Sequence, residues 1–334
     1  MDKLKIGVIG TGHLGKLHAR MFKEIDDSIL TGIYDSNTEL AKTVSGEFNV
    51  PAFNSLEELL NEVDAVSIAA TTSAHYELAK VCLQKGKHIF IEKPITATIA
   101  EAEEVVKIAG NMNLKLQIGH IERFNPALVS MEKYIKDPKF IQTDRLSQFN
   151  PRGTDVAVVL DLMIHDIDII LSLVKNEVTN IEASGVAIVS DNIDIANARI
   201  QFGNGAVANV TASRISQKKM RKMRIFQSDG YIALDFVTGV SEVYRLLPVE
   251  QEVEQGFISF GEIGVGNKKK RLIYEQPGHK DINALKYELQ LFVDAVLNDK
   301  KPVVSGDDGL RALRIAKIII DKIDQSLANL KLSR

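Results

Sequence analysis

The sequence predicts an α/β fold, a doubly wound parallel sheet, followed by an α+β domain with a large, mainly antiparallel sheet. Up to about residue 120, short apolar runs such as "LKIGVIG" and "DAVSIAA" alternate with helical stretches. Strands that are buried on both faces and joined by crossover helices have this pattern. Beyond that point, alternating segments are separated by "GNG" and "SDG", breaks that are typical of hairpins. The 334 residues are enough for two domains, predicted at 1–122 and 123–334.

The elements of the first domain follow one another regularly. We expect, in order, the strand "LKIGVIG", a helix at 15–24, the strand "SILTGIYD", the helix "TELAKTVSGEF" and a short extended segment at 50–53. Three helix–strand pairs follow: "SLEELL" with "DAVSIAA", "AHYELAKVCLQKG" with "HIFIEK", and "IAEAEEVVKIAGNMN" with "LKLQIG". Apolar residues recur at three- and four-residue spacing in the helices, so each helix has a face to bury against the sheet.

The second domain has a different pattern. A helix at 126–135 starts with proline, extended "FIQTDRLSQF" follows, and an apolar helical stretch covers about 158–175. The hairpins come from "DIANARIQF" with "AVANVTASR" and from "KMRIFQ" with "YIALDF". Helices at about 284–297 and 309–327 come last. A ligand site is expected where the two domains meet.

Composition excludes several classes of protein. A net charge of −3 gives no global attraction to nucleic acid or to an anionic membrane. The single cysteine, Cys82, excludes an internal disulfide, and its helical surroundings favour a buried, unreactive thiol in a reducing compartment. No signal peptide precedes the first strand, and no apolar run approaches the ~20 residues of a membrane span. These features predict a cytoplasmic protein.

The stretch "GTGHLG" has the G-x-G-x-x-G spacing of a dinucleotide-binding turn. It follows a strand, opens a helix and precedes Asp35, which lies at the end of the second strand. Gly10 permits the tight turn, Gly12 lets the backbone approach a pyrophosphate, and Gly15 lets helix and strand pack closely. The helix N-terminus would bind the pyrophosphate. A glycine-rich turn that binds nothing is the alternative to this Rossmann-type site.

Asp35 also bears on the choice of cofactor. Its carboxylate would accept hydrogen bonds from the adenosine ribose hydroxyls and would repel a 2′-phosphate. Neither Ser36 nor Asn37 supplies the arginine that could bind such a phosphate. The sequence therefore favours NAD over NADP.

The stretch "HIFIEKPIT" ends a buried strand with Lys93, which Pro94 follows. Ligands of a doubly wound sheet lie beyond the carboxyl ends of the strands, so Lys93 is expected at the cofactor cleft, in the extended conformation that Pro94 favours. A solvated strand end is the alternative. Another strand end, "AATTSAH", places Thr71, Thr72 and His75 at the same edge, although His75 could equally be a helix residue without a ligand. The residues expected at the cofactor are Gly10, Gly12, His13, Leu14, Gly15, Asp35, Thr71, Thr72, His75, Glu92 and Lys93.

A polar stripe runs along the apolar helix that contains "DLMIHDID". Asp161, His165 and Asp168 share one face of this helix, at positions i, i+4 and i+7. Because an unpaired buried charge is costly, the stripe needs partners or a task. Three interpretations remain open: a self-satisfied structural network, a metal site of two carboxylates and an imidazole, or a catalytic histidine oriented by a carboxylate one turn away. Asp166 falls off this face and is expected to point to solvent or to a loop.

Together these motifs resemble the Gfo/Idh/MocA family of sugar oxidoreductases over nearly the whole sequence. The glycine turn, "GKHIFIEKP", the D-x-x-x-H-x-x-D helix and the closing "KPVVSGDDGLRAL" occur in the family's order. The resemblance implies that Lys93, Asp161 and His165 are the catalytic residues, acting at the nicotinamide. No metal-binding residue is predicted. Family members often have proline where this sequence has Thr72, a departure that concerns only the shape of that edge.

The segment "GHIERFNPA" resembles the UDP-N-acetylglucosamine 3-dehydrogenase branch of the family, whose members oxidise the sugar's C3 hydroxyl to a ketone. The resemblance implies NAD-dependent oxidation of UDP-N-acetylglucosamine or a related nucleotide sugar. Arg123 suits sugar or phosphate oxygens because of its fixed fork of donors, and a salt bridge at the domain junction is its alternative role. The residues expected at the substrate are His120, Arg123, Asn125, Asp161 and His165.

In the implied mechanism, His165, oriented by Asp161, accepts the hydroxyl proton, and Lys93 stabilises the developing alkoxide, although Lys93 and His165 could exchange these roles.

Other functions compete with this one. A glycosidase that holds NAD would form no net NADH, and a dehydrogenase of another sugar or polyol would keep the fold. An NAD-sensing or scaffold protein would leave the three catalytic residues without a task. The resemblance also implies a homo-oligomer, a dimer or tetramer, that packs through the exposed face of the second-domain sheet.

Overall fold

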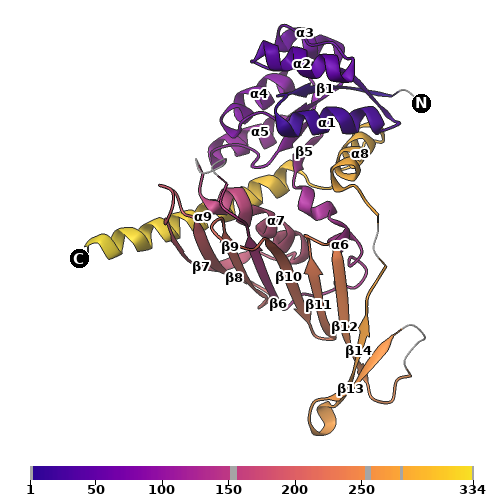
Figure 1. Ribbon diagram of the computed structural model, residues 1–334, viewed down its shortest axis with the longest axis vertical. Helices are drawn as coiled ribbons and strands as arrows, with labels where there is room; N and C mark the ends of the chain where they lie inside the picture. The colour runs from indigo at the N-terminus through magenta and orange to yellow at the C-terminus, as the bar shows by residue number, and fades with distance from the viewer. Residues whose placement is uncertain (1–2, 151–155, 253–256, 279–280, 333–334) are drawn as a thin grey trace. The chain divides into compact units, whose positions relative to one another are not determined.

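The computed structural model describes residues 3–150, 156–252, 257–278 and 281–332 (Figure 1). These residues form two compact units. The first contains the chain up to Phe124 together with Asn283–Arg314, and the second contains Asn125–Ile282 and the chain from Ile315 onward. The chain therefore returns to the first unit after it has built the second. The predicted domain boundaries, 1–122 and 123–334, stay a prediction.

The first unit contains a five-stranded parallel sheet in the order β2-β1-β3-β4-β5, which confirms the predicted doubly wound fold. The strands are β1 Leu4–Ile9, β2 Ser28–Tyr34, β3 Ala65–Ile68, β4 His88–Glu92 and β5 Leu116–Gly119. The helices that connect them are α1 His13–Glu24, α2 Thr38–Phe48, α3 Leu56–Glu62, α4 Thr72–Gln84 and α5 Ile99–Asn111. The extended segment expected at 50–53 forms only an isolated bridge from Ala52 to Ile33. Pro51 lies in its middle and has no N–H to donate to a neighbouring strand.

Short polar side chains start several of these helices. Asn37 and Ser55 accept hydrogen bonds from the backbone N–H groups of Leu40 and Glu58, and so cap α2 and α3. Thr98 and Glu101 form a reciprocal capping box at the start of α5. Each cap satisfies donors that the first helical turn leaves without a partner, so the sequence determines where these helices begin.

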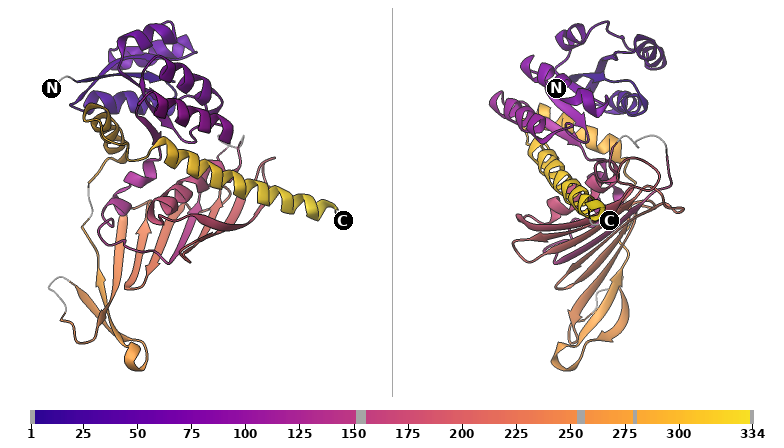
Figure 2. Two further views of the ribbon diagram at one scale, coloured as in Figure 1. Left: turned by 180° about the vertical axis from the view of Figure 1, so that it is seen from behind. Right: turned by 90° about the vertical axis from the view of Figure 1, so that its left-hand side faces the viewer.

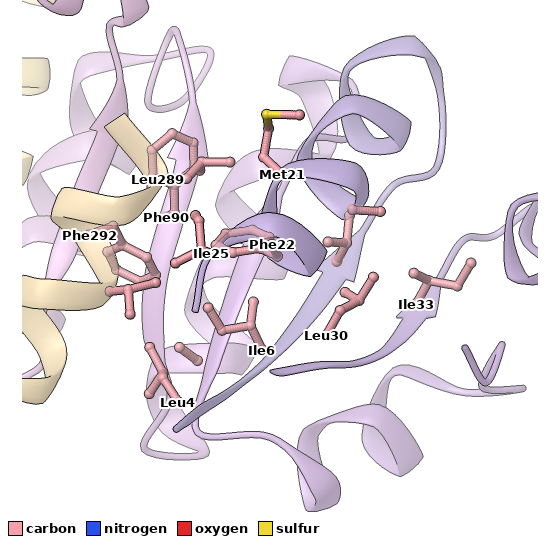
Figure 3. Close-up of a cluster of buried hydrophobic side chains, with 14 of the residues drawn as sticks. Leu4, Ile6, Met21, Phe22, Ile25, Leu30, Ile33, Phe90, Leu289 and Phe292 are labelled. Carbon is pink, nitrogen blue, oxygen red and sulfur yellow. The ribbon is translucent and has the colours of Figure 1, made fainter. Parts of the chain in front are cut away.

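The core of the first unit includes a helix from the far end of the chain. Helix α8, Ala284–Leu297, contributes Leu289, Phe292 and Val293 to the cluster of buried side chains drawn in Figure 3. Phe292 packs edge-on against Phe90 of β4, with ring centroids 5.9 Å apart. The same stretch of chain also reaches β5, because the N–H of Ile118 donates to the carbonyl of Val304. The first unit is therefore completed by residues that lie between the two segments of the second unit in sequence.

The second unit contains a nine-stranded sheet in the order β13-β14-β12-β11-β10-β6-β9-β8-β7. Its neighbouring strands are antiparallel except for β6 and β9, which are parallel. The structure confirms the two predicted hairpins, β8–β9 and β10–β11. The strands are β6 Phe140–Leu146, β7 Val178–Val186, β8 Ile195–Phe202, β9 Val207–Ser213, β10 Met220–Gln227, β11 Gly230–Asp235, β12 Val240–Pro248, β13 Ile258–Ile263 and β14 Lys270–Glu275.

Helices cover one face of this sheet (Figure 2). They include α6 Pro126–Val129, the π-helical turn η2 Val159–Met163, α7 Ile164–Leu173 and the later part of α9 Gly306–Leu332. Helix α6 is shorter than the helix expected at 126–135, which continues only as turns. Ser130 contributes to this early end, because its hydroxyl donates to the carbonyl of Ala127 and competes with helical hydrogen bonding. Within the described ranges, no helix is both long and apolar enough to cross a membrane.

Candidate functional site

The glycine turn between β1 and α1 has the backbone geometry of a pyrophosphate-binding loop. Gly10 has φ +87°, and a Cβ at this position would lie 2.7 Å from the backbone nitrogen of Ala70. A Cβ at Gly15 would lie 1.8 Å from the carbonyl oxygen of Gly10, so only glycine lets α1 approach β1 this closely. A Cβ at Gly12 would meet no atom within 4 Å. Gly12 thus borders open space at the N-terminus of α1, where a dinucleotide's pyrophosphate would fit.

The carboxylate of Asp35 is held beside this turn. Its Oδ2 accepts hydrogen bonds from the N–H and the hydroxyl of Thr11, at 2.6 and 3.0 Å. Its Oδ1 accepts one from the N–H of Asn37, at 2.8 Å. Because an ionised carboxylate accepts about four hydrogen bonds, the group keeps capacity for a ribose hydroxyl. The fixed negative charge lies where the sequence predicted it, at the end of β2.

Lys93 follows the last residue of β4, at the carboxyl edge of the parallel sheet, and is half-buried. Its peptide bond to Pro94 is cis. Thr71 and Thr72 follow β3 and lie at the start of α4. Thr71 is the N-cap and Thr72 is the first helical residue. The helix therefore begins here although the sequence lacks the proline that family members often have at position 72. His13 and Leu14 are exposed in the first turn of α1. The predicted cofactor residues of the first unit therefore border one edge of the sheet, and their contacts with the cofactor stay a prediction.

Among the predicted cofactor residues, His75 has a different environment. It is 1% exposed. Its Nδ1 lies 2.9 Å from the carbonyl oxygen of Pro94, and its Nε2 lies 3.2 Å from that of Ala70. Burial lowers the pKa of this imidazole, which favours the neutral ring. The side chain connects the end of β3 with the backbone that follows Lys93, an arrangement that neither of its two sequence interpretations included.

The predicted catalytic helix lies in the second unit. Asp161 is in the π-helical turn η2 and His165 is in α7, and both are half-buried. Asp168, the third residue of the stripe, is 1% exposed. Helices η2 and α7 follow each other without a break, so Asp161 and His165 remain about one turn apart. This spacing is what a carboxylate needs to orient an imidazole.

The expectation that Asp166 points to solvent or a loop was wrong. Asp166 is 2% exposed and forms two hydrogen bonds with the equally buried Arg145 of β6, from Nε at 2.9 Å and from Nη2 at 2.7 Å. A buried carboxylate requires such a partner, which the helix alone could not reveal. The sequence of the strand nevertheless indicated that Arg145 is buried, since Arg145 falls on the same face of β6 as the buried Ile141 and Thr143. The pair holds the residue next to His165.

A second buried arginine supports the start of η2. Arg214 donates from Nη2 to the carbonyl of Val156 at 2.6 Å, and its Nε lies 3.9 Å from Oδ1 of Asp194. Asp194 also accepts from the N–H groups of Ile188 and Val189, and these hydrogen bonds outweigh burial and lower its pKa. The chain is therefore held on both sides of Asp161, before it by Arg214 through the Val156 carbonyl and after it by Arg145 of β6 through the Asp166 carboxylate.

The residues expected at the substrate from "GHIERFNPA" have structural partners. His120 is 1% exposed at the end of β5. Arg123 lies 3.8 Å from Asp308 of α9, and both residues belong to the first unit, so this ion pair is not the domain-junction salt bridge given as the alternative role. Asn125 caps α6 through the N–H of Ala127 and donates to the carbonyl of Phe236. Their substrate role stays a prediction.

Metal ligation and thiol chemistry find no support among the described residues. In the part of the chain that the structure describes, no three histidine, cysteine or carboxylate side chains gather as a metal site would require. Cys82 is fully buried, as predicted, and burial raises the pKa of its thiol to about 12, so it is not a nucleophile near neutral pH.

Sequence comparison matches both units. The first unit matches a family described as "Oxidoreductase family, NAD-binding Rossmann fold" over residues 4–120, and residues 134–233 match the "GFO/IDH/MocA C-terminal domain". A UDP-N-acetylglucosamine 3-dehydrogenase from Acidithiobacillus ferrooxidans is 42% identical over 250 residues, 73% of this chain and 78% of that protein. This chain belongs to the Gfo/Idh/MocA oxidoreductase family. It is an NAD-dependent enzyme of that family, as the motifs predicted.

Other relatives show the breadth of the family. A myo-inositol 2-dehydrogenase from Thermotoga maritima is 27% identical over 329 residues, 93% of each chain. Among solved structures, that of the Acidithiobacillus ferrooxidans enzyme has a TM-score of 0.86 and 35% identity, covering 97% of this chain and 99% of its own. A levoglucosan dehydrogenase in complex with NADH and L-sorbose has a TM-score of 0.82 at 20% identity, covering 97% of this chain and 98% of its own, and so shares the fold.

Proposed function

We propose that this enzyme oxidises the C3 hydroxyl of UDP-N-acetylglucosamine, or of a closely related nucleotide sugar, with NAD as oxidant. The observation that carries the proposal is the 42% identity over 250 residues to a UDP-N-acetylglucosamine 3-dehydrogenase. The segment "GHIERFNPA" supports the same branch of the family. Inositol dehydrogenases are more distant, at 23–29% identity, so a polyol is the weaker alternative.

The proposed mechanism divides the work between two groups of side chains. Bound NAD supplies the hydride acceptor, and the protein supplies position and charge. His165, oriented by Asp161, takes the proton of the C3 hydroxyl. The ammonium of Lys93 stabilises the negative charge that develops on the same oxygen. The glycine turn and Asp35 hold the adenosine half of the cofactor.

We expect NADH formation with UDP-N-acetylglucosamine and little with free N-acetylglucosamine. The diphosphate supplies remote binding energy that positions the reacting carbon, so its removal lowers kcat as well as affinity. NADH absorbance measured over a panel of nucleotide sugars, free sugars and inositols checks this expectation. Turnover of free sugars or inositols with no response to UDP-sugars would contradict the substrate. Hydrolysis of a glycoside without net NADH would instead indicate the glycosidase alternative.

We expect NAD to bind more tightly than NADP, because the Asp35 carboxylate repels a 2′-phosphate. Asp35→Ser combined with Ser36→Arg should shift the preference toward NADP by about tenfold or more, since it removes the repulsion and adds a bidentate donor. Calorimetric titration of both cofactors checks the shift. Ser36→Arg alone is the matched control and should shift the preference less. The thermal stability of each variant should also be measured, because Asp35 accepts hydrogen bonds from Thr11 and its replacement removes them. Equal affinity of the wild-type enzyme for the two cofactors would contradict the role of Asp35.

We also propose that the enzyme is a homo-oligomer that packs through the helix-free face of the second-unit sheet. One cross-strand row on that face is aromatic: Phe140, Phe226, Tyr231, Tyr244 and Tyr274 lie opposite one another in successive strands. Tyr231 and Tyr244 are stacked with centroids 4.3 Å apart. The row is only half-buried, and next to it Phe260 of β13 is 57% exposed. Contiguous exposed apolar surface of this kind is typical of a protein–protein interface.

Charge introduced into the aromatic row should separate the subunits. Tyr231→Glu with Tyr244→Glu would place two like charges opposite each other in the interface, which is unfavourable when they are desolvated. Light scattering coupled to size exclusion should show a wild-type oligomer and a smaller species for the double variant. Leu40→Glu, at an exposed position of α2, is the control and should leave the mass unchanged. A monomeric wild-type enzyme would contradict the proposal.

A further inference from the structure

The segment Glu92–Lys93–Pro94 is held by a buried histidine on each side of Lys93. His75 comes from the first turn of α4 and His18 from the middle of α1, and they are 1% and 0% exposed. A buried imidazole is stable only when its ring nitrogens have suitable partners. In both cases one of those partners belongs to a residue adjacent to Lys93.

His18 lies next to the side chain that precedes Lys93. Its Nε2 is 3.0 Å from Oε1 of Glu92, within ion-pair distance, although this contact does not have the geometry of a hydrogen bond. Its Nδ1 is 2.8 Å from the hydroxyl of Ser67, which is fully buried in β3. A proton on Nε2 makes the contact with the Glu92 carboxylate favourable, and it leaves Nδ1 free to accept from the Ser67 hydroxyl. A Cβ at Gly119 would lie 3.0 Å from the carboxyl of Glu92, so the glycine leaves the space in which this carboxyl meets His18.

His75 holds the backbone that follows Lys93. Two carbonyl oxygens face its ring, and a neutral imidazole has one N–H to offer. The shorter contact, 2.9 Å, assigns that N–H to Nδ1 and its acceptor to the Pro94 carbonyl. The 3.2 Å contact of Nε2 places the ring against the end of β3. The Pro94 carbonyl is therefore tied to α4, a different element from the strand that carries Lys93.

We propose that His75 and His18 are positioning residues for Lys93, His75 through the Pro94 carbonyl and His18 through the Glu92 carboxylate. The inference rests on the proposed function, in which the Lys93 ammonium must meet a single oxygen. Side-chain reach alone does not define such a position, because four rotatable bonds separate the ammonium from the backbone. A fixed Pro94 carbonyl on one side and a fixed Glu92 carboxylate on the other reduce the remaining freedom of Lys93, and a displacement of about 1 Å can cost about a hundredfold in rate.

The two nitrogens of each ring can be tested separately. An asparagine amide nitrogen lies close to the position of Nδ1, and a glutamine amide nitrogen lies close to that of Nε2. His75→Asn should therefore keep the donor to Pro94, whereas His75→Gln should lose it. At His18 the order reverses, because the Glu92 contact is made by Nε2: His18→Gln should keep it and His18→Asn should lose it. A role limited to general packing predicts no such reversal.

We expect kcat for His75→Gln and His18→Asn to fall by about tenfold to a hundredfold, and further than for His75→Asn and His18→Gln. The dissociation constant for NAD, measured by calorimetry, should change much less than kcat. Hydrogen exchange of the backbone in a peptide covering residues 92–96, measured by mass spectrometry without cofactor, should be faster in the two damaging variants. Equal kcat within each Asn/Gln pair, or unchanged exchange, would overturn the proposal. Ser67→Ala, which removes the donor to His18 but leaves both rings, should give a smaller change in the same direction.

The double variant Lys93→Met with His75→Gln separates this inference from the proposed function. If His75 acts through Lys93, the second substitution should add little to the loss caused by the first. Multiplied losses would mean that His75 acts elsewhere, and the inference would fail while the function stands. If Lys93→Met retained turnover, the catalytic role of Lys93 would fail, and the exchange measurement would still decide whether the histidines hold the backbone.

Discussion

Lys93→Met is expected to lower kcat by about two to three orders of magnitude, with a much smaller effect on NAD affinity. Methionine preserves most of the side-chain length and removes the charge, so the loss reports electrostatic stabilisation of the reacting oxygen rather than packing. The cofactor should still bind, because the glycine turn and Asp35 hold its adenosine half. Steady-state turnover of UDP-N-acetylglucosamine and calorimetric titration of NAD measure the two effects.

A matched control is available for this substitution. Lys107→Met changes an exposed lysine of α5 and should leave turnover and stability nearly unchanged, since exposed substitutions usually alter the free energy of unfolding by no more than ~0.5 kcal/mol. If Lys93 were only a solvated strand end, the two variants would behave alike. Near-full turnover of Lys93→Met with bound NAD would show that this lysine is not catalytic.

His165→Ala is expected to lower kcat by about two to four orders of magnitude, because it removes the proposed acceptor of the hydroxyl proton. The pH profile gives a readout that a structural role would not change. In the wild-type enzyme kcat should fall toward acid pH as the base becomes protonated, and this limb should disappear in the variant. Asp161→Asn should retain the imidazole but orient it less well, so its loss should be smaller.

Ser172→Ala provides the control for His165, because it disturbs the far end of the same helix by removing a hydroxyl that donates to the carbonyl of Ile169. It should affect stability slightly and the pH profile not at all. A variant that combines Lys93→Met with His165→Ala should cost less than the product of the two losses, since groups that serve one reacting hydroxyl do not act independently. An unchanged acid limb in His165→Ala would assign the proton to another group.

The sequence predicted the parallel sheet and two hairpins of the second sheet because these depend on local periodicity. Strands β7, β12, β13 and β14 were not predicted. Buried parallel strands read as short apolar runs, and the antiparallel strands alternate about glycine-containing turns. Helices α2, α3 and α5 start at capping residues that can be recognised in sequence. The glycine turn was predictable for the same reason, since each of its glycines stands where a side chain would be too large for the turn, the cofactor or the helix packing.

What the sequence did not predict depends on partners far apart in the chain. Asp166 was assigned to the surface because its partner, Arg145, belongs to a strand 21 residues earlier. His18 went unnoticed because Ser67 and Glu92 reach it from two other strands. His75 was predicted either to bind the cofactor or to be a helix residue that binds nothing, yet its ring contacts the backbone carbonyls of Pro94 and Ala70. Polar groups inside a core are explained by three-dimensional neighbours, which spacing along one element does not reveal.

The return of Asn283–Arg314 to the first unit determines where the gene can be divided. A fragment that stops near residue 122 would lack Leu289, Phe292 and Val293 and would expose the apolar surface they cover. Removing even one such side chain typically costs about 2–5 kcal/mol, so three together exceed what a small domain can lose. It would also leave the edge of β5 without the carbonyl of Val304, and bare strand edges favour aggregation. A cofactor-binding module for isolated expression would therefore need the later segment spliced onto the earlier one.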